Sequence, residues 1–377
     1  MKFSIDKSKF VNNINTVLRA ISSKTTIPIL SGIYLDLKSE GLTISGSDAD
    51  ISITTFIDQS DADNNLTIES TGSIVLTARF FSEIIKKLPG DTLSINVLDN
   101  KQTIISAGKS EFTINGIDAV NYPHLPEVAT DSQITLSTEL LKEVVNQTVI
   151  AVSNQESRPI LTGVNLNIKE GNLKAVATDS HRLSQRNVKI DSSSDYDFII
   201  PGKSLLELTR TINENISEVK MSISENQVLF SFGDTLFYSR LLEGNYPETD
   251  RLIPETSNTT VTFDASALLA SVERASLLSH ESRNNVIRLQ ISSNNNLITI
   301  YGNSPEVGTV EENVPFTNIT GEDLEISFNP DYLKDSLKVL GSTEITMKFT
   351  SPLHPFTIEP LNNDEDFIQL ITPVRTY

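Results

Sequence analysis

The stretch FSIDKSKFVNNINTV (Phe3–Val17) opens a unit that recurs along this 377-residue chain. Its alternating apolar residues predict a short strand, a polar residue follows at the N-cap position, and apolar residues then recur at helical spacing. The same order returns in ITLSTELLKEVVNQTV (Ile134–Val149) and VTFDASALLASVERAS (Val261–Ser276). The equivalent strand and cap residues are Ile5 and Asp6, Leu136 and Ser137, and Phe263 and Asp264. Three such openings indicate an internal threefold repeat.

The similarity continues beyond these openings. IPILSGIYLDL from Ile27 matches RPILTGVNLNI from Arg158, and RNNVIRLQI from Arg283 is a weaker third copy. One offset of 131 residues also carries Asp48 to Asp179. The second half of each unit repeats as well, since IVLTARFFSEIIKKL, FIIPGKSLLELTRTI and ISFNPDYLKDSLKVL each indicate a strand, a turn and an amphipathic helix.

These patterns predict the α+β class, with three similar domains that each contain two helices and about eight short strands in antiparallel sheets. The helices are expected to cover one side of the sheets. Matching turns, NYPHLP from Asn121 and NYPETDRLIP from Asn245, end the first two units, because proline stops a strand. We therefore expect domains at residues 1–126, 127–254 and 255–377, with boundaries near Pro126 and Pro254.

Composition limits the kind of protein. Hydrophobic residues make up 38% of the chain, which is enough for packed cores. There is no cysteine, so disulfides and thiolate metal sites are excluded, and no sequence feature indicates a cofactor. The N-terminus has no apolar signal core, and no apolar run is long enough to span a membrane. The simplest expected location is the cytoplasm.

The net charge of −19 argues against nucleic-acid binding if it is taken alone. The six predicted helices, however, carry 12 basic and 7 acidic residues, a net +5, whereas the rest carries −24. Surface helices often carry Lys and Arg, but one basic helical face would also suit phosphate contacts. Spheres the size of a 125-residue domain leave a hole of only about 3 Å radius when three form a ring and about 18 Å when six do. A B-form duplex of roughly 10 Å radius needs the six-domain ring, and hence two copies of the chain.

Asp179-Ser180-His181-Arg182 raises the question of catalysis, because the chain has only four histidines. Consecutive side chains on a strand point to opposite faces, so these residues are not expected to converge as a catalytic triad. Asp48 and Asn303 occupy similar places in the other repeats, which favours turn chemistry for Asp179. A Ser/His hydrolase using Ser180 and His181 is the least favoured alternative, since no nucleophile elbow or phosphate-binding loop is present. A monomeric scaffold of repeated domains is a second alternative.

Four segments carry a resemblance to a known family. They are ATDSHRL from Ala177, LLEGNYPETDRLIP from Leu241, SPLHPFTIEP from Ser351 and the terminal TPVRTY. Together they resemble the bacterial DNA sliding clamps, the beta subunits of DNA polymerase III. The resemblance implies a head-to-tail homodimeric ring of six domains with helices inside. It also implies a non-catalytic processivity factor that encircles double-stranded DNA without sequence preference, is opened by a clamp loader and tethers the replicative polymerase and repair proteins.

The resemblance further implies a pocket for partner peptides between domains two and three, apolar with a few orienting polar groups. Its expected residues are Leu161, Thr178, Ser180, His181, Arg182, Leu183, Pro247, Leu252, Leu353, Pro355, Thr372, Pro373, Val374 and Arg375. Partner peptides are expected to insert Leu or Phe anchors. The chain departs from the family pattern in two places, because Ser180 stands where glycine is usual and the C-terminal tail runs past the usual end.

Two further sets of residues are expected to serve the ring. The first would face DNA: Lys24, Arg79, Lys203, Arg210 and Arg283. Leu277 and Leu278, at the end of a predicted helix, resemble the family's apolar contact between subunits. The alternative for these leucines is an ordinary role in the core beneath their helix, and the sequence alone leaves both readings open.

Overall fold

The computed structural model describes residues 1–22, 24–123, 133–281, 285–362 and 366–375. The chain divides into two compact units, one of Met1–Leu141 with Glu207–Leu241 and one of Lys142–Leu206 with Leu242–Tyr377. Each unit therefore combines one whole repeat with part of the middle repeat. The expected boundary at Pro126 lies outside the described residues, and Pro254 lies between the short 3-10 helix Asp250–Leu252 and the next strand.

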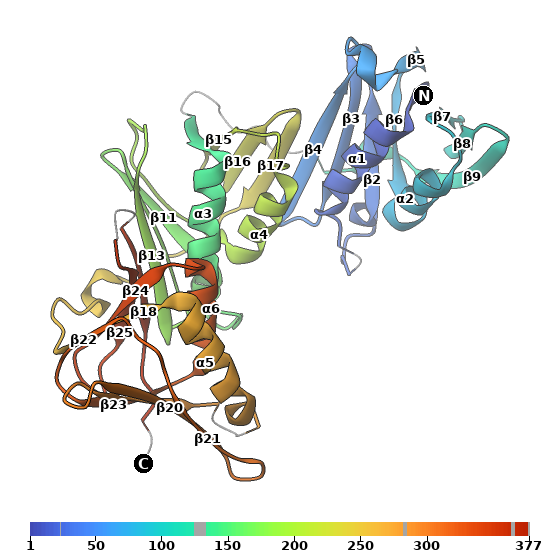
Figure 1. Cartoon of the computed structure of the whole chain (residues 1–377). Coiled ribbons are helices and arrows are strands. Elements are labelled where there is room, and N and C mark those ends of the chain that lie inside the picture. Colours follow the sequence, from blue (N-terminus) through green and yellow to red (C-terminus); the bar gives the residue numbers. More distant parts are fainter. Residues whose placement is uncertain (23, 124–132, 282–284, 363–365, 376–377) are drawn as a thin grey trace. The chain divides into compact units, whose positions relative to one another are not determined.

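The first unit is built on one 13-stranded antiparallel sheet (Figure 1), in the order β10-β15-β16-β17-β4-β3-β2-β6-β9-β8-β7-β1-β5. The first repeat supplies β1 (Lys2–Asp6), β2 (Gly32–Leu37), β3 (Gly41–Ser47), β4 (Ile51–Asp58), β5 (Thr67–Ser70), β6 (Gly72–Thr77), β7 (Thr92–Val97), β8 (Gln102–Ala107) and β9 (Ser110–Ile117). The second repeat supplies β10 (Ile134–Ser137), β15 (Glu218–Ile223), β16 (Gln227–Phe232) and β17 (Thr235–Arg240). Helices α1 (Lys7–Leu18) and α2 (Ala78–Lys87) pack on one another, and both contact β2.

The second unit contains two antiparallel sheets. One has nine strands in the order β14-β11-β12-β13-β26-β25-β24-β18-β22, and the other has four in the order β21-β20-β19-β23. The second repeat supplies β11 (Gly163–Lys169), β12 (Asn172–Thr178), β13 (Arg182–Lys189) and β14 (Tyr196–Pro201). The third supplies β18 (Thr259–Asp264), β19 (Ile287–Ser292), β20 (Leu297–Ser304), β21 (Gly308–Asn313), β22 (Asn318–Gly321), β23 (Leu324–Phe328), β24 (Glu344–Phe349), β25 (Phe356–Pro360) and β26 (Phe367–Ile371). Its helices α5 (Ala265–Ser279) and α6 (Pro330–Leu340) pack on each other.

The predicted helix starts are confirmed. Asp6 accepts a hydrogen bond from the backbone N–H of Lys9 at 2.9 Å, and Asp264 accepts one from Ala267 at 2.8 Å. Ser137 does the same for Leu140, at the start of α3 (Thr138–Val149). Side chains in these places satisfy N–H groups that the first helical turn leaves unpaired. The fourth helix, α4, spans Gly202–Thr211.

The repeats are joined edge to edge, which the sequence did not show. In the first unit β17 of the second repeat pairs with β4 of the first, and in the second unit β13 of the second repeat pairs with β26 of the third. We call these two pairings the inner seams. The three-repeat α+β fold is confirmed. Each inner seam, however, continues a sheet from one repeat into the next.

One local expectation was wrong. Asp179, Ser180 and His181 lie in the turn between β12 and β13 and not on a strand. Alternation between the two faces of a strand therefore does not apply to them. Among the described residues, no helix is long and apolar enough to cross a membrane.

Candidate partner-binding site and basic helices

The turn at Asp179 is built by that carboxylate. One oxygen accepts the N–H groups of His181 at 2.9 Å and Arg182 at 3.0 Å. Asp48 repeats the geometry in the first repeat with Asp50 and Ile51, which confirms turn chemistry for both aspartates. The residues after them, Ser180 and Ala49, have φ of 79° and 81°, in the left-handed region that favours glycine.

The third repeat differs, and the expectation for Asn303 was wrong. Asn303 lies inside β20, paired with Thr309. Ser304 closes the turn instead, because its hydroxyl accepts a hydrogen bond from the Val307 N–H at 3.3 Å. The difference follows from the later end of β20, which moves the turn further along the chain.

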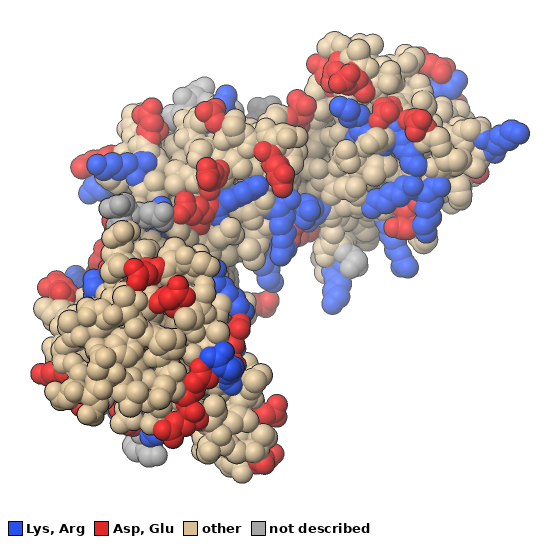
Figure 2. All heavy atoms as spheres, in the orientation of Figure 1, with Lys and Arg blue, Asp and Glu red and all other residues tan. Residues whose placement is uncertain are grey.

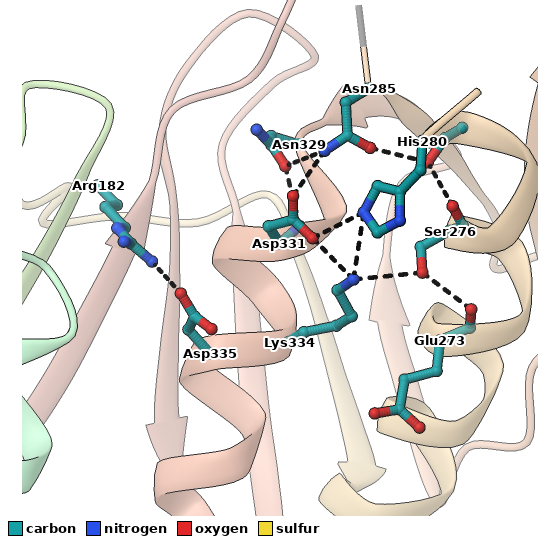
Figure 3. Close-up of polar contacts among 10 residues, drawn as sticks. Arg182, Glu273, Ser276, His280, Asn285, Asn329, Asp331, Lys334 and Asp335 are labelled. Atoms are coloured by element: carbon teal, nitrogen blue, oxygen red, sulfur yellow. Dashed lines mark hydrogen bonds and ion pairs between the residues drawn. The ribbon is translucent and has the colours of Figure 1, made fainter. Parts of the chain in front are cut away.

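Arg182 is held by groups of both repeats at the β13–β26 seam. Its guanidinium pairs with Asp179 at 3.1 Å and with Asp335 of α6 at 2.7 Å, as Figure 3 shows for Asp335. It also lies over the Tyr332 ring, 4.7 Å from the centroid. The ring of His181 stacks on Tyr332 at 6.4 Å. Only 13% of the Arg182 side chain is exposed, and its contacts with Asp335 and Tyr332 join the second repeat to the third.

Beneath this turn lies a small apolar cluster of Val176, Leu183 and Leu370, with Tyr246 and Ile253 packed against it. The Tyr246 hydroxyl accepts a hydrogen bond from the Thr178 N–H at 2.9 Å. Burial raises the pKa of Tyr246 well above its usual value, with a further contribution from the Asp179 charge, so the phenol stays neutral. Leu183 was among the expected pocket residues, whereas the other four cluster members were missed. For Val176 and Leu370 the only signal was the alternation of buried strand positions, and Tyr246 and Ile253 lie in the segment between β17 and β18.

The C-terminal tail is fixed to the same seam. The N–H of Thr372 donates to the His181 carbonyl at 2.9 Å, and that of Val374 donates to the Ser327 carbonyl at 2.7 Å. Phe356 pairs with Ile371, so Pro355 lies beside the start of the tail. The structure thus brings the turn at Asp179 together with the end of β26 and the tail that follows it, although the two regions lie far apart in sequence.

The remaining expected pocket residues lie in the segments before β11 and β18, in the turn between β24 and β25, and in the tail. Leu161 is buried in the 3-10 helix Pro159–Thr162, which Arg158 precedes, and the Arg158 side chain donates to the Ser180 hydroxyl at 3.0 Å. Leu252 and Leu353 expose 50% and 58% of their surface. Pro247 and Arg375 are exposed, and Pro373 is half-buried.

A separate cavity of about 440 Å³ in the second unit contains none of the expected residues. Helix α3 contributes Glu143 and Gln147 to its lining, and α6 contributes Val339 and Leu340. This cavity is therefore separate from the residues expected to bind partner peptides. Across the described ranges, no three His, Asp or Glu side chains gather as a metal site.

The expected DNA-facing residues divide by helix. Arg79 lies on α2, Lys203 and Arg210 lie on α4, and Lys24 follows α1; all four are exposed. Arg283 lies outside the described residues. Arg210 is paired with Glu207 at 2.7 Å, which reduces its free charge. Figure 2 shows basic side chains gathered over α2 in the first unit.

The end of α5 carries the expected subunit-contact leucines. Leu277 exposes 69% of its surface and Leu278 is half-buried, so Leu277 has no place in the core of its own chain. Beyond them, His280 and Lys334 both contact Asp331 of α6, at 2.9 and 2.7 Å (Figure 3). Burial alone would raise the pKa of Asp331, but the hydrogen bonds and charges of Lys334 and His280 together lower it below its usual value.

Three α+β repeats joined through shared antiparallel sheets define the class of DNA-clamp folds. Three family models of the DNA polymerase III beta subunit match this chain. The model of the N-terminal domain matches residues 1–126, that of the central domain matches 135–248 and that of the C-terminal domain matches 250–375. The beta sliding clamp of Bacillus subtilis is 49% identical over 380 residues and is covered completely, as is this chain. The chain therefore belongs to the DNA polymerase III beta subunit family, the sliding clamps, and is a non-catalytic processivity factor of DNA replication.

Solved structures agree. The beta chain of DNA polymerase III from Streptococcus pneumoniae superposes with a TM-score of 0.97 at 47% identity, with all of both chains covered. A sliding clamp from Pseudomonas aeruginosa, solved with bound griselimycin, superposes with a TM-score of 0.91 at 28% identity and is also covered in full, as is this chain.

Proposed function

We propose that two copies of this chain close head to tail into a ring around double-stranded DNA, through strand pairing that repeats the inner seams. Each repeat contains two runs of three consecutive antiparallel strands. Each inner seam pairs the third strand of a first run, β4 or β13, with the third strand of the second run in the next repeat, β17 or β26. The third strands of the two remaining runs are β21 and β9. Among the described residues, β21 is the outer strand of its sheet, and β9 meets β6 only through Ile117 and Gly116. These edges are the observation that carries the proposal, because an unpaired edge is a template for a second chain.

The inner seams also set the register. Phe237, the third residue of β17, lies opposite Ile53 of β4, and both are fully buried. Phe112 is likewise the third residue of β9. Ile53 pairs with Gly46 and Val310 pairs with Gly302, and in each case a Cβ on the glycine would meet a backbone carbonyl of the preceding first helix at 2.5 Å. Phe112 of one copy should therefore lie opposite Val310 of the other.

Disulfide cross-linking tests this ring. The chain has no cysteine, so every disulfide in a Phe112→Cys, Val310→Cys double variant joins introduced residues. Residues opposite one another in an antiparallel pair have Cα atoms about 4.5–5.5 Å apart, within reach of a disulfide. We expect a covalent dimer under oxidising conditions that stays on circular DNA and leaves it after linearisation. Each single-cysteine variant is the control. A double variant that remains monomeric on a non-reducing gel, or that cross-links no better than the singles, would contradict the proposal.

The ring would serve partners through the surface over the Leu183 cluster. We propose that peptides of the replicative polymerase and of other replication and repair proteins insert apolar anchors beside Leu252, Leu353 and Val374, with His181 and the tail at the edge. A clamp loader would open the ring, and the protein would act with the chromosome in the cytoplasm. Support comes from the exposure of these three apolar side chains and from the buried apolar cluster around Leu183 in the same unit. Domain boundaries near Pro126 and Pro254 remain part of this proposal.

Calorimetry with a short peptide that carries Leu and Phe anchors tests the peptide site. We expect His181→Ala, or truncation after Ile371, to weaken binding by about tenfold, since each removes part of the rim of the site. Leu297→Ala is a matched control, because Leu297 is also an exposed leucine but belongs to β20 of the other sheet. Sedimentation should show the dimer intact in all three variants. Unchanged affinity in both test variants would remove the assignment.

A further inference from the structure

We infer that the cavity of about 440 Å³ in the second unit binds an organic cation, an amidinium or guanidinium group carried on an apolar body. A cavity of this size is within the range of small-molecule sites. All of its lining residues belong to the second unit, so the inference does not depend on how two copies form a ring.

The walls of the cavity come from two repeats. The second repeat supplies one wall from α3, and the third supplies the end of α6, the start of β24 and the facing ends of β25 and β26. Much of this lining is apolar, with Val339 and Leu340 on α6, Leu361 after β25 and the buried Phe367 at the start of β26. These side chains suit the apolar body of an organic ligand.

The charge of the lining is negative. Glu143 and Glu344 are the charged residues among the described residues that line the cavity, and none of these residues is basic. Glu143 is balanced by the buried Arg186, whose guanidinium lies 3.7 Å from its carboxylate. Glu344 accepts a hydrogen bond from the Thr317 hydroxyl and has no ion pair within the described residues. An unbalanced carboxylate beside an apolar wall favours a cationic ligand.

The hydrogen-bonding groups of the cavity are mainly acceptors. The amide nitrogen of Gln147 donates to the Glu143 carboxylate at 3.2 Å, and because an ionised carboxylate only accepts, this contact fixes the orientation of the amide. Gln147 is only 7% exposed, and its amide oxygen has no donor within the described part of the chain. The Thr343 hydroxyl donates to the Leu340 carbonyl at 3.4 Å. Apart from the exposed amide of Asn362, the polar lining therefore requires donors, which amidinium and guanidinium groups supply.

This cavity is distinct from the candidate peptide site. Arg186 lies four residues after Arg182 on β13, which corresponds to roughly 13 Å along the strand. Arg186 is paired with Phe367 across the β13–β26 seam, whereas Arg182 is paired with Ile371 at the other end of β26. A ligand in the cavity would contact both the second and the third repeat, and would leave the turn at His181 free for a peptide.

Calorimetry of the full-length protein with benzamidine tests the site, and benzamide, which has the same ring without the charge, is the control ligand. We expect benzamidine to bind at least about tenfold more tightly than benzamide. Glu344→Gln should weaken benzamidine binding about threefold to tenfold because it removes the unbalanced charge, and Gln147→Leu should do the same because it removes the acceptor oxygen. Glu139→Gln, which removes an exposed carboxylate of α3 outside the cavity, is the matched control and should have no effect.

Equal affinity for benzamidine and benzamide would overturn the inference, as would benzamidine binding that Glu344→Gln leaves unchanged. Because Glu344 is exposed, this variant should fold even if Gln147→Leu does not. A crystal structure with benzamidine in which only ordered water contacts Gln147 would also overturn it. N-Acetylarginine amide distinguishes the sources of the cation. Binding that Glu344→Gln weakens assigns the site to an arginine side chain of a partner protein, whereas binding of benzamidine alone assigns it to a free amine or amidine.

Discussion

Ala49 and Ser180 are two of the eight non-glycine residues with positive φ in the described part of the chain. Each follows the aspartate that builds its turn, and each lies at an inner seam, where Asp50 and His181 present their carbonyls to the neighbouring strand. The family pattern of glycine at position 180 has a physical basis in this φ value, because a Cβ is unfavourable there. Ser180 partly offsets the cost by accepting a hydrogen bond from Arg158.

Glycine substitutions at these positions should therefore differ. We expect Ala49→Gly to stabilise the chain by about 0.5–1 kcal/mol, because it relieves an unfavourable backbone conformation and removes no hydrogen bond of a side chain. Ser180→Gly should give a smaller gain, since the bond to Arg158 is lost. Urea denaturation followed by circular dichroism measures both. A loss of stability in Ala49→Gly would show that the turn does not carry the expected strain.

At the scale of elements, the end of α5, the start of α6 and the loop before β19 meet in one polar cluster. Asn329 caps α6 by accepting from the Asp331 N–H at 2.9 Å, and Asn285 donates to Asp331. His280 and Lys334 complete the cluster. The arrangement holds the end of α5, which carries Leu277, against the start of α6.

Acid should weaken this cluster. The pKa of Asp331 is lower in the folded chain than in the unfolded chain, so its carboxylate contributes stability at pH above the unfolded value. That contribution is lost as pH falls through the folded value. We expect Asp331→Asn to be less stable than the parent at pH 7 and to lose part of the parent's decline in stability below pH of about 4. Asp323→Asn, on the same repeat, is the control. Parallel pH profiles for parent and Asp331→Asn would contradict the assignment.

For the whole molecule, the acidic total of −19 and the basic helices have complementary effects. Negative charge elsewhere repels DNA from other surfaces, and Lys and Arg on α2 and α4 offer sequence-independent contacts to phosphates. Direct affinity should be weak and salt-sensitive, and retention should depend on ring closure. This combination allows a clamp to slide.

Charge reversal tests the DNA face. We expect Arg79→Glu with Lys203→Glu to shorten retention on circular DNA and to reduce the slope of log affinity against log salt by roughly 1–2, because each phosphate contact contributes about 0.9. Lys169→Glu, an exposed lysine at the end of β11, is the control. Retention and loading that match the parent in the double variant would remove these residues from the DNA face.

The sequence predicted much of the fold because local chemistry repeats. Caps at Asp6, Ser137 and Asp264 and the apolar periods after them define the helices without reference to distant residues. The Asp48 and Asp179 turns were predictable for the same reason. The place of Asn303 was not predictable, because β20 continues through this residue and the turn comes later. The end of the strand and the turn have similar composition there, so the sequence does not mark the boundary.

What the sequence determined by itself was the threefold repeat, the helix starts and the excess of positive charge on the helices, since each depends on neighbouring residues or on composition. Only the tertiary structure decided that sheets run through the repeats, that Arg182 is held by Asp335 and Tyr332, and that Val176, Tyr246, Ile253 and Leu370 pack with Leu183. Strand pairing between distant segments leaves no local signal, because any exposed edge offers the same N–H and C=O groups, and packing against specific partners selects among them.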